Sequence, residues 1–305
     1  KGEMRKFLKS KVNRIALAVG ACSLIATPIA IVVSCSLGSK QIEPDEIDKW
    51  AYIQYRKWYD SLSNEEMDMF QTYTQKDASG QLWNVFLHRG NEKALEDLAK
   101  NGVSQIKSEE YQPCIGQSYI PTVGYKHIDN ALGRNKVGYF DPLTKEKMVV
   151  YHAYEFYETE ILDKLYSALR IKNLKDYDLS RIDEIYTYRL NGVEITSTGY
   201  WATSMDKKSS LDGSNLRKWN AQVGEAWNVC PIYEVELDPE LTGAYLSLPQ
   251  IKHNNELLAP HDRHMFLINR NFKLRINDAQ LIKKEDDQGI YYQLLIKCKA
   301  SLIEE

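Results

Sequence analysis

The spacing of hydrophobic positions changes once along this chain. From Ile47 onward apolar residues recur at helical intervals, and one face carries Trp50, Ile53 and Trp58. After Asp176 apolar and polar residues alternate with a period of two, which is typical of half-buried strands. Helices first and strands afterwards indicate an α+β chain rather than one with alternating α/β units.

The helical half contains one clear start signal. Ser63-Asn64-Glu65-Glu66 combines a capping residue with acids in the first turn, which predicts that a helix begins there. Residues 102–150 are rich in Gly and Pro and predict mostly loop. Tyr151–Leu174 has the pattern of an amphipathic helix. Further helices are expected at Leu82–Leu87, Ala94–Leu98 and His127–Leu132.

The second half predicts a series of short strands. They are expected at Ile185–Leu190, Val193–Ser197, Ile232–Leu237, Ala244–Leu248, Glu256–Leu258, Met265–Ile268, Lys273–Ile276 and Tyr291–Cys298. Asn191-Gly192 is a two-residue hairpin signal, so the first two strands are expected to pair.

The N-terminal segment differs from the rest of the chain. Residues 1–14 carry six basic groups and one acid, and Ile15–Val33 is an uncharged apolar run of 19 residues. This arrangement indicates an export signal. The run ends in Val32-Val33-Ser34-Cys35, which resembles a bacterial lipobox. We therefore expect a lipoprotein-type signal peptide at 1–34, lipidation of Cys35, a lipid-anchored tether at 35–48 and a single domain at 49–303. The alternative is an uncleaved transmembrane helix.

Charge and cysteine content exclude several classes of protein. Without residues 1–34 the chain keeps 33 basic and 41 acidic residues, a formal charge of −8. That charge argues against nucleic acid as a partner and against polybasic attachment to anionic lipid. Cys114, Cys230 and Cys298 have no paired spacing, and the six histidines form no metal motif. We expect neither a disulfide framework nor a metal site.

Three segments carry the candidate chemistry. Arg189 lies in a tyrosine-rich segment, Tyr186-Thr187-Tyr188-Arg189. A small hydroxyl-bearing strand, Gly199-Tyr200-Trp201-Ala202-Thr203-Ser204, follows it. About 50 residues later Glu256 precedes an apolar pair in His253-Asn254-Asn255-Glu256-Leu257-Leu258-Ala259-Pro260.

This order of arginine, hydroxyl strand and glutamate resembles the mono-ADP-ribosyltransferase toxin family, in its clostridial C2/C3-like branch. The resemblance covers about Trp50 to Leu302 and includes the helical segment with Asn84 and Arg89. It implies a helical part, 49–176, packed on a two-sheet, antiparallel-rich core, 177–303.

The resemblance also implies roles for individual residues. Glu256 would be catalytic, and Arg189, Asn84, Arg89, Thr203 and Ser204 would bind NAD, which is a substrate. Tyr245 and Asn254 would contact the acceptor protein.

The chemistry implied by the resemblance suits these residue types. Breaking the bond between nicotinamide and ribose builds positive charge on the ribose, and a carboxylate such as Glu256 stabilises that charge. A guanidinium binds a pyrophosphate through two parallel hydrogen bonds, which suits Arg189 and Arg89. The hydroxyls of Thr203 and Ser204 would orient the glutamate.

Three positions depart from the family pattern. Ala202 stands where the first serine of the hydroxyl strand is expected, and only 13 residues separate Arg189 from Thr203, fewer than is usual. Asn254 stands two before Glu256, where the family has glutamate or glutamine.

Two classes of function therefore remain open. The first is a secreted or surface-anchored bacterial toxin or virulence factor that transfers ADP-ribose from NAD to a protein in a target cell, or an NAD glycohydrolase. The second is a catalytically weak or inactive NAD-binding surface lipoprotein of the same fold. A lipid-anchored adhesin is a third reading.

Overall fold

The computed structural model describes residues 44–76, 79–101, 123–153, 158–207, 227–286 and 288–303. They belong to one compact unit, Lys40–Glu305. The expected signal peptide, Cys35 and the tether up to residue 43 lie outside the described residues. Pro44–Asp48 already forms the start of a helix, so the last part of the expected tether is helical. None of the helices in the described ranges is long and apolar enough to cross a membrane.

The N-terminal half is helical, as expected. Its helices are α2 (Pro44–Tyr59), α3 (Asn64–Gln71), the π-helical η1 (Thr72–Lys76), α4 (Ser79–His88), α5 (Glu92–Asn101), α6 (Tyr125–Gly133) and α7 (Thr159–Leu169). The start signal at Ser63 is confirmed as a capping box. The Ser63 amide donates to Glu66 Oε2 at 3.0 Å, and the Glu66 amide donates to Ser63 Oγ at 3.2 Å.

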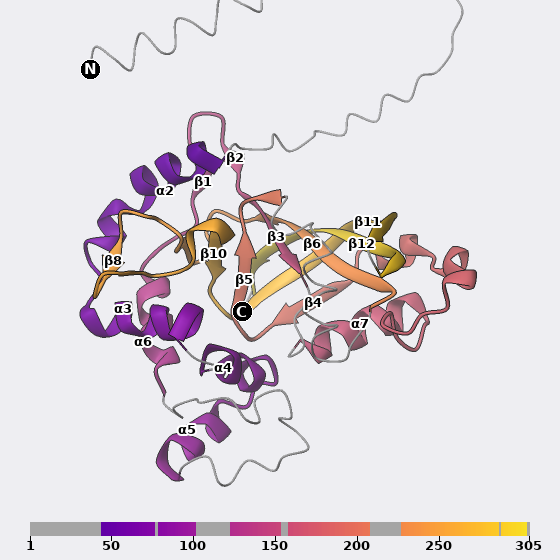
Figure 1. Cartoon of the computed structure of the whole chain (residues 1–305), viewed down its shortest axis with the longest axis horizontal. Helices are drawn as coiled ribbons and strands as arrows, with labels where there is room; N and C mark the ends of the chain where they lie inside the picture. The colour runs from indigo at the N-terminus through magenta and orange to yellow at the C-terminus, as the bar shows by residue number, and fades with distance from the viewer. Residues whose placement is uncertain are drawn as a thin grey trace, which may run out of the picture. The chain divides into compact units, whose positions relative to one another are not determined.

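The strands form a mixed sheet in the order β4-β11-β12-β6-β3-β5-β10-β7 (Figure 1). These strands are β3 (Val149–Ala153), β4 (Glu194–Ser197), β5 (Trp201–Ser204), β6 (Val229–Leu237), β7 (Gly243–Tyr245), β10 (Met265–Ile268), β11 (Phe272–Asp286) and β12 (Gly289–Leu302). Among the described strand pairs of this sheet, only β6 and β12 are parallel. Two small hairpins join β1 (Tyr139–Asp141) to β2 (Glu146–Lys147) and β8 (Lys252–His253) to β9 (Glu256–Leu257).

The sheet folds over itself at the junction of β3 and β5. One residue pair, Tyr151 with Ser204, joins these two strands. Trp201 of β5 contacts the ring of Phe272 of β11, with centroids 5.6 Å apart. Strands lie about 4.8 Å apart, so in a flat sheet strands four positions apart would be separated by roughly 19 Å. The strands therefore form two groups around Trp201, which confirms the expected α+β class with a two-sheet, antiparallel-rich core.

Two expected elements are wrong. Tyr151–Ala153 is not the start of a helix but part of β3, which pairs with β6 along its whole length. The interior position of β3 lets the strand be apolar on both faces, and this hides the alternation that marks exposed strands. Thr187–Leu190 is not a strand but the 3₁₀-helix η5, which follows a second one, η4 (Leu179–Glu184).

The predicted hairpin at Asn191-Gly192 is instead a turn between η5 and β4. Asn191 has φ −61° and ψ 126°, Gly192 has φ +79°, and the Val193 amide donates to Leu190 O at 3.0 Å. These values describe a type II turn, whose third position needs a positive φ and therefore favours glycine.

Candidate functional site

Asn84 of α4 fixes the backbone that leads into β5. Its Oδ1 accepts from the Tyr200 amide at 3.1 Å, and its Nδ2 donates to Tyr200 O at 3.3 Å. Nδ2 also donates to the Tyr73 hydroxyl at 2.8 Å. Asn84 is buried, so its amide group serves as a structural clamp on Tyr200.

His88 shares this helix face with Asn84, because residues four apart lie on one side of a helix. Its Nε2 lies 3.3 Å from Tyr200 O, and its ring lies against Gly199. A Cβ on Gly199 would come within 2.2 Å of that ring, so only glycine fits there. Arg89, one residue later, is exposed, so the structure brings His88 rather than Arg89 to β5.

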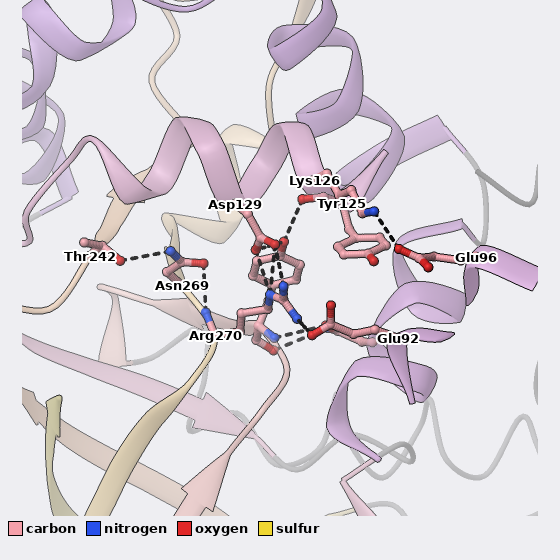
Figure 2. A network of polar contacts seen from close by, with 10 residues as sticks. Glu92, Glu96, Tyr125, Lys126, Asp129, Thr242, Asn269 and Arg270 are labelled. Atoms are coloured by element: carbon pink, nitrogen blue, oxygen red, sulfur yellow. Dashed lines mark hydrogen bonds and ion pairs between the residues drawn. The ribbon is translucent and has the colours of Figure 1, made fainter. Parts of the chain in front are cut away.

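Tyr200 is held from its other end by the network in Figure 2. Its hydroxyl donates to Asp129 Oδ1 at 2.6 Å and lies 2.9 Å from Tyr125 O. Arg270 binds Asp129 with two N–H groups, Nε to Oδ1 at 2.8 Å and Nη2 to Oδ2 at 2.7 Å, and it also pairs with Glu92. The network joins α5, α6 and the β10–β11 turn to the entrance of β5.

His152 of β3 also contacts β5, and sequence reasoning missed it. Its Nδ1 lies 3.0 Å from Ala202 O, and its Nε2 lies 2.8 Å from Glu158 Oε1 at the start of α7. The ring stacks on Trp201 with centroids 4.1 Å apart. Val149-Val150 directly before Tyr151-His152 is the β-branched signal that could have revealed this strand.

Two histidines and one glutamate therefore gather around β5. His152 and Glu158 are almost fully enclosed. Burial lowers the pKa of His88, with a further small lowering from His152 and an opposing rise from Glu158. A buried neutral imidazole offers no permanent positive charge to a pyrophosphate, unlike the guanidinium groups that the family resemblance implies.

The hydroxyls of β5 are occupied within the protein. Thr203 Oγ1 donates to Phe266 O of the neighbouring β10 at 2.7 Å. Ser204 Oγ accepts from the Asp206 amide at 3.0 Å. Both side chains are buried, so they fix the end of β5 and the segment that follows it.

Glu256 begins β9 and is exposed. It is in the hairpin β8–β9, whose turn residues Asn254 and Asn255 have φ +53° and +66°. Positive φ at both turn positions is the type I′ geometry, which asparagine tolerates and which matches the twist of a hairpin. From this hairpin the chain runs through the buried Leu258 and Ala259 to β10, the neighbour of β5. The carboxylate is thus displayed to solvent on a tightly turned support.

The two expected acceptor contacts lie in different environments. Asn254 is exposed at the hairpin turn. Tyr245 is buried, and its hydroxyl donates to Asp48 Oδ1 at 2.7 Å and lies 3.0 Å from His264 Nδ1. Burial raises the pKa of Tyr245. Of the two, only Asn254 faces the surface.

Arg189 lies in a separate place. Its Nη1 donates to Leu169 O at 3.1 Å, and its guanidinium lies 4.7 Å from the centre of the Tyr186 ring. It lines a cavity of about 580 Å³ formed by residues of the 169–189 segment, and no residue of β5 or of the β8–β9 hairpin lines that cavity. In Figure 1, α7 and β8 lie toward opposite ends of the sheet. The observed role of Arg189 is to cap the carbonyl of Leu169, the last residue of α7.

Metal chemistry was not expected. Within the described ranges no group of three or more His, Cys, Asp or Glu side chains is arranged to hold a metal ion.

No protein family model and no curated protein matches this chain. Solved structures do match it. C3stau2 from S. aureus, solved with NAD, is 13% identical, with 86% of this chain and 97% of that chain covered and a TM-score of 0.50. Plx2a, an ADP-ribosyltransferase toxin from Paenibacillus larvae, is 15% identical over 86% and 98%, with a TM-score of 0.46. The Clostridium limosum C3 exoenzyme is 14% identical over 84% and 94%, also with a TM-score of 0.46. The chain therefore shares the fold of C3stau2.

Proposed function

We propose that this chain is an NAD-dependent mono-ADP-ribosyltransferase that moves ADP-ribose from NAD to a protein acceptor, with Glu256 as the catalytic carboxylate. The observation that carries the proposal is the setting of Glu256. Its backbone is fixed in a tight hairpin, its side chain is exposed, and the chain continues from it into the strand beside β5. An exposed carboxylate on a rigid support suits an interaction that forms only in the transition state.

The chemistry follows from the charge that develops on the ribose. As the nicotinamide bond breaks, the ribose becomes oxocarbenium-like, and an ionised Glu256 beside it lowers the energy of that state. Asn84 and His88 hold Tyr200 and so define where β5 begins. In this proposal their part is to position β5.

The test is nicotinamide release from NAD by the full chain in mild detergent. We expect release from the parent protein and a loss of at least about 100-fold in kcat for Glu256→Gln, the range seen when a group stabilising transition-state charge is removed. The variant Glu240→Gln, which changes an exposed carboxylate elsewhere, is the matched control. Equal release by parent and Glu256→Gln would refute the assignment of Glu256.

A second candidate function is a catalytically weak or inactive NAD-binding protein. The buried His152–Glu158 pair beside Ala202 favours it. These two side chains lie next to the hydroxyl strand, and the described residues of β3 and β5 include no arginine that could bind a pyrophosphate. NAD binding without nicotinamide release would support this candidate. Release without transfer to any protein would identify the glycohydrolase variant.

Export and anchoring are part of the same proposal. The N-terminal basic and apolar segments and Cys35 support a lipid-anchored or secreted bacterial protein whose acceptor lies in a target cell. Incorporation of labelled fatty acid in the parent but not in Cys35→Ala is the expected result. Equal labelling of both proteins would contradict lipidation at Cys35.

A further inference from the structure

The hairpin that carries Glu256 is docked on a row of three polar side chains from the helical layer. Asp68 and Gln71 of α3 and Thr74 of η1 are spaced three residues apart and contact the hairpin in sequence. Asp68 Oδ1 lies 3.0 Å from His253 Nε2, and the Thr74 hydroxyl donates to Leu258 O. The row spans the whole segment from β8 to the residue after β9.

Gln71 is at the centre of this row. Its Nε2 lies 2.8 Å from His253 O, 3.1 Å from Glu256 O and 3.2 Å from Leu257 O. All three partners are carbonyl oxygens, so the nitrogen must face them and the amide orientation is determined. One buried amide therefore holds both strands of the hairpin, including the backbone of Glu256 itself.

The other end of the same amide is its carbonyl oxygen, Oε1. Gln71 is fully buried, and its Oε1 makes no hydrogen bond among the described residues. A buried polar oxygen without a partner lowers stability, but an apolar side chain of the same size would leave three hairpin carbonyls without this donor. The contacts to the hairpin therefore account for glutamine at this position.

We propose that Gln71 is a positioning residue for Glu256: it sets the height and angle of the hairpin so that the carboxylate reaches the ribose as charge develops. This inference rests on the proposed function. A catalytic group displaced by about 1 Å can lose about 100-fold in rate while substrate binding is retained, because the interaction is made in the transition state.

The first experiment measures nicotinamide release by the full chain carrying Gln71→Met. Methionine keeps the length of the side chain and removes both N–H donors. We expect kcat to fall about tenfold to 100-fold with KM for NAD unchanged within about twofold. Thr74→Val, which removes one contact to Leu258 O, should also lower kcat, but by less than Gln71→Met does. It provides a second test if Gln71→Met does not fold.

The second experiment uses pH. In Gln71→Glu a carboxylate would face three carbonyl oxygens in a buried place, which raises its pKa and repels the hairpin. On acidification the acid regains one O–H donor, so kcat relative to the parent should recover as pH falls. Asp68, His253 and Glu256 are ionisable side chains on or beside the hairpin, so the pH profiles of the parent and of Gln71→Met are the reference. Neither of these should show the recovery.

Gln280→Met, at an exposed position of β11, is the matched control and should keep the parent kcat. Hydrogen exchange of the amides of residues 252–258 reports anchoring independently of activity and should be faster in Gln71→Met. Parent-like kcat and parent-like exchange in Gln71→Met would overturn the inference. Absence of release from the parent protein together with faster exchange in Gln71→Met would instead refute the proposed function while leaving the anchoring role intact.

Discussion

Removing Arg270 should destabilise the fold far more than removing an exposed arginine with a similar ion pair. The Arg270 side chain is 13% exposed and Asp129 is 25% exposed, and three hydrogen bonds of 2.7, 2.8 and 3.0 Å join them. Arg270→Met keeps the aliphatic stem and leaves Asp129 without its counter-charge. Breaking a buried pair costs about 3–5 kcal/mol, and partial hydration of Asp129 places our expectation near the lower limit, at about 3 kcal/mol.

Arg181→Met is the matched control. Arg181 binds both carboxylate oxygens of Glu184, but the two side chains are 61% and 50% exposed. Exposed pairs contribute little to stability, so Arg181→Met should unfold at nearly the same urea concentration as the parent.

The assay is urea unfolding followed by tryptophan fluorescence. For a domain of this size we also expect Arg270→Met to lower Tm by roughly 6–12 °C. Equal losses of unfolding free energy in the two variants, or a loss below about 1 kcal/mol for Arg270→Met, would refute the reasoning that burial determines how much this network stabilises the fold.

Three further predictions concern the surroundings of the site. Gly199→Ala should lower the free energy of unfolding by about 1–3 kcal/mol because its Cβ meets the His88 ring. The double variant with His88→Ala should lose less free energy of unfolding than the sum of the two single losses, and strict additivity in urea unfolding would show that the two positions are independent. Arg134 lowers the pKa of Glu66 below its ordinary value of 4.5, so this pair stabilises the fold above about pH 4.5 and that stabilisation is lost as pH falls through the lowered pKa. Glu66→Gln should therefore be less stable than the parent at pH 7, and the difference in free energy of unfolding should be smaller at pH 3. An equal difference at both pH values would argue against a stabilising role of the pair. Arg189→Met should cost about 1 kcal/mol through loss of the α7 cap and leave KM for NAD unchanged; a tenfold rise in KM would place Arg189 in the NAD site after all.

The sequence predicts local elements well where one face of an element is solvent-exposed. The capping box at Ser63 agrees with the structure because local chemistry determines it, and the strand expected at Val193–Ser197 agrees with β4 because exposed and buried residues alternate along it. Alternation could not reveal β3, because a strand between two others is apolar on both faces. The tyrosines 186 and 188 alternate like a strand, yet both are exposed at 44% and 65%, so their spacing did not reflect burial.

For the candidate site, the sequence identified the segments more reliably than the side chains. Asn84 does contact the hydroxyl-strand segment, but the second residue of α4 that does so is His88 rather than Arg89. Residues four apart share one face of a helix, so this spacing indicates His88. His152 and Glu158 are only six residues apart, but they lie beside β5 because β3 pairs with it, and no local pattern encodes that long-range pairing. Gln71 was overlooked for the same reason, since its partners lie more than 180 residues away.

The position of β12 in the sheet has a consequence for how the chain is made. This strand, Gly289–Leu302, lies between β11 and β6 and pairs with both along most of its length. β12 is synthesised after the other described strands of this sheet, so the sheet cannot be completed until residue 302 has left the ribosome. A chain cut before Gly289 would leave β6 and β11 with open edges, and such edges pair with strands of other molecules. Truncated products of this protein are therefore expected to aggregate rather than to persist as smaller soluble domains.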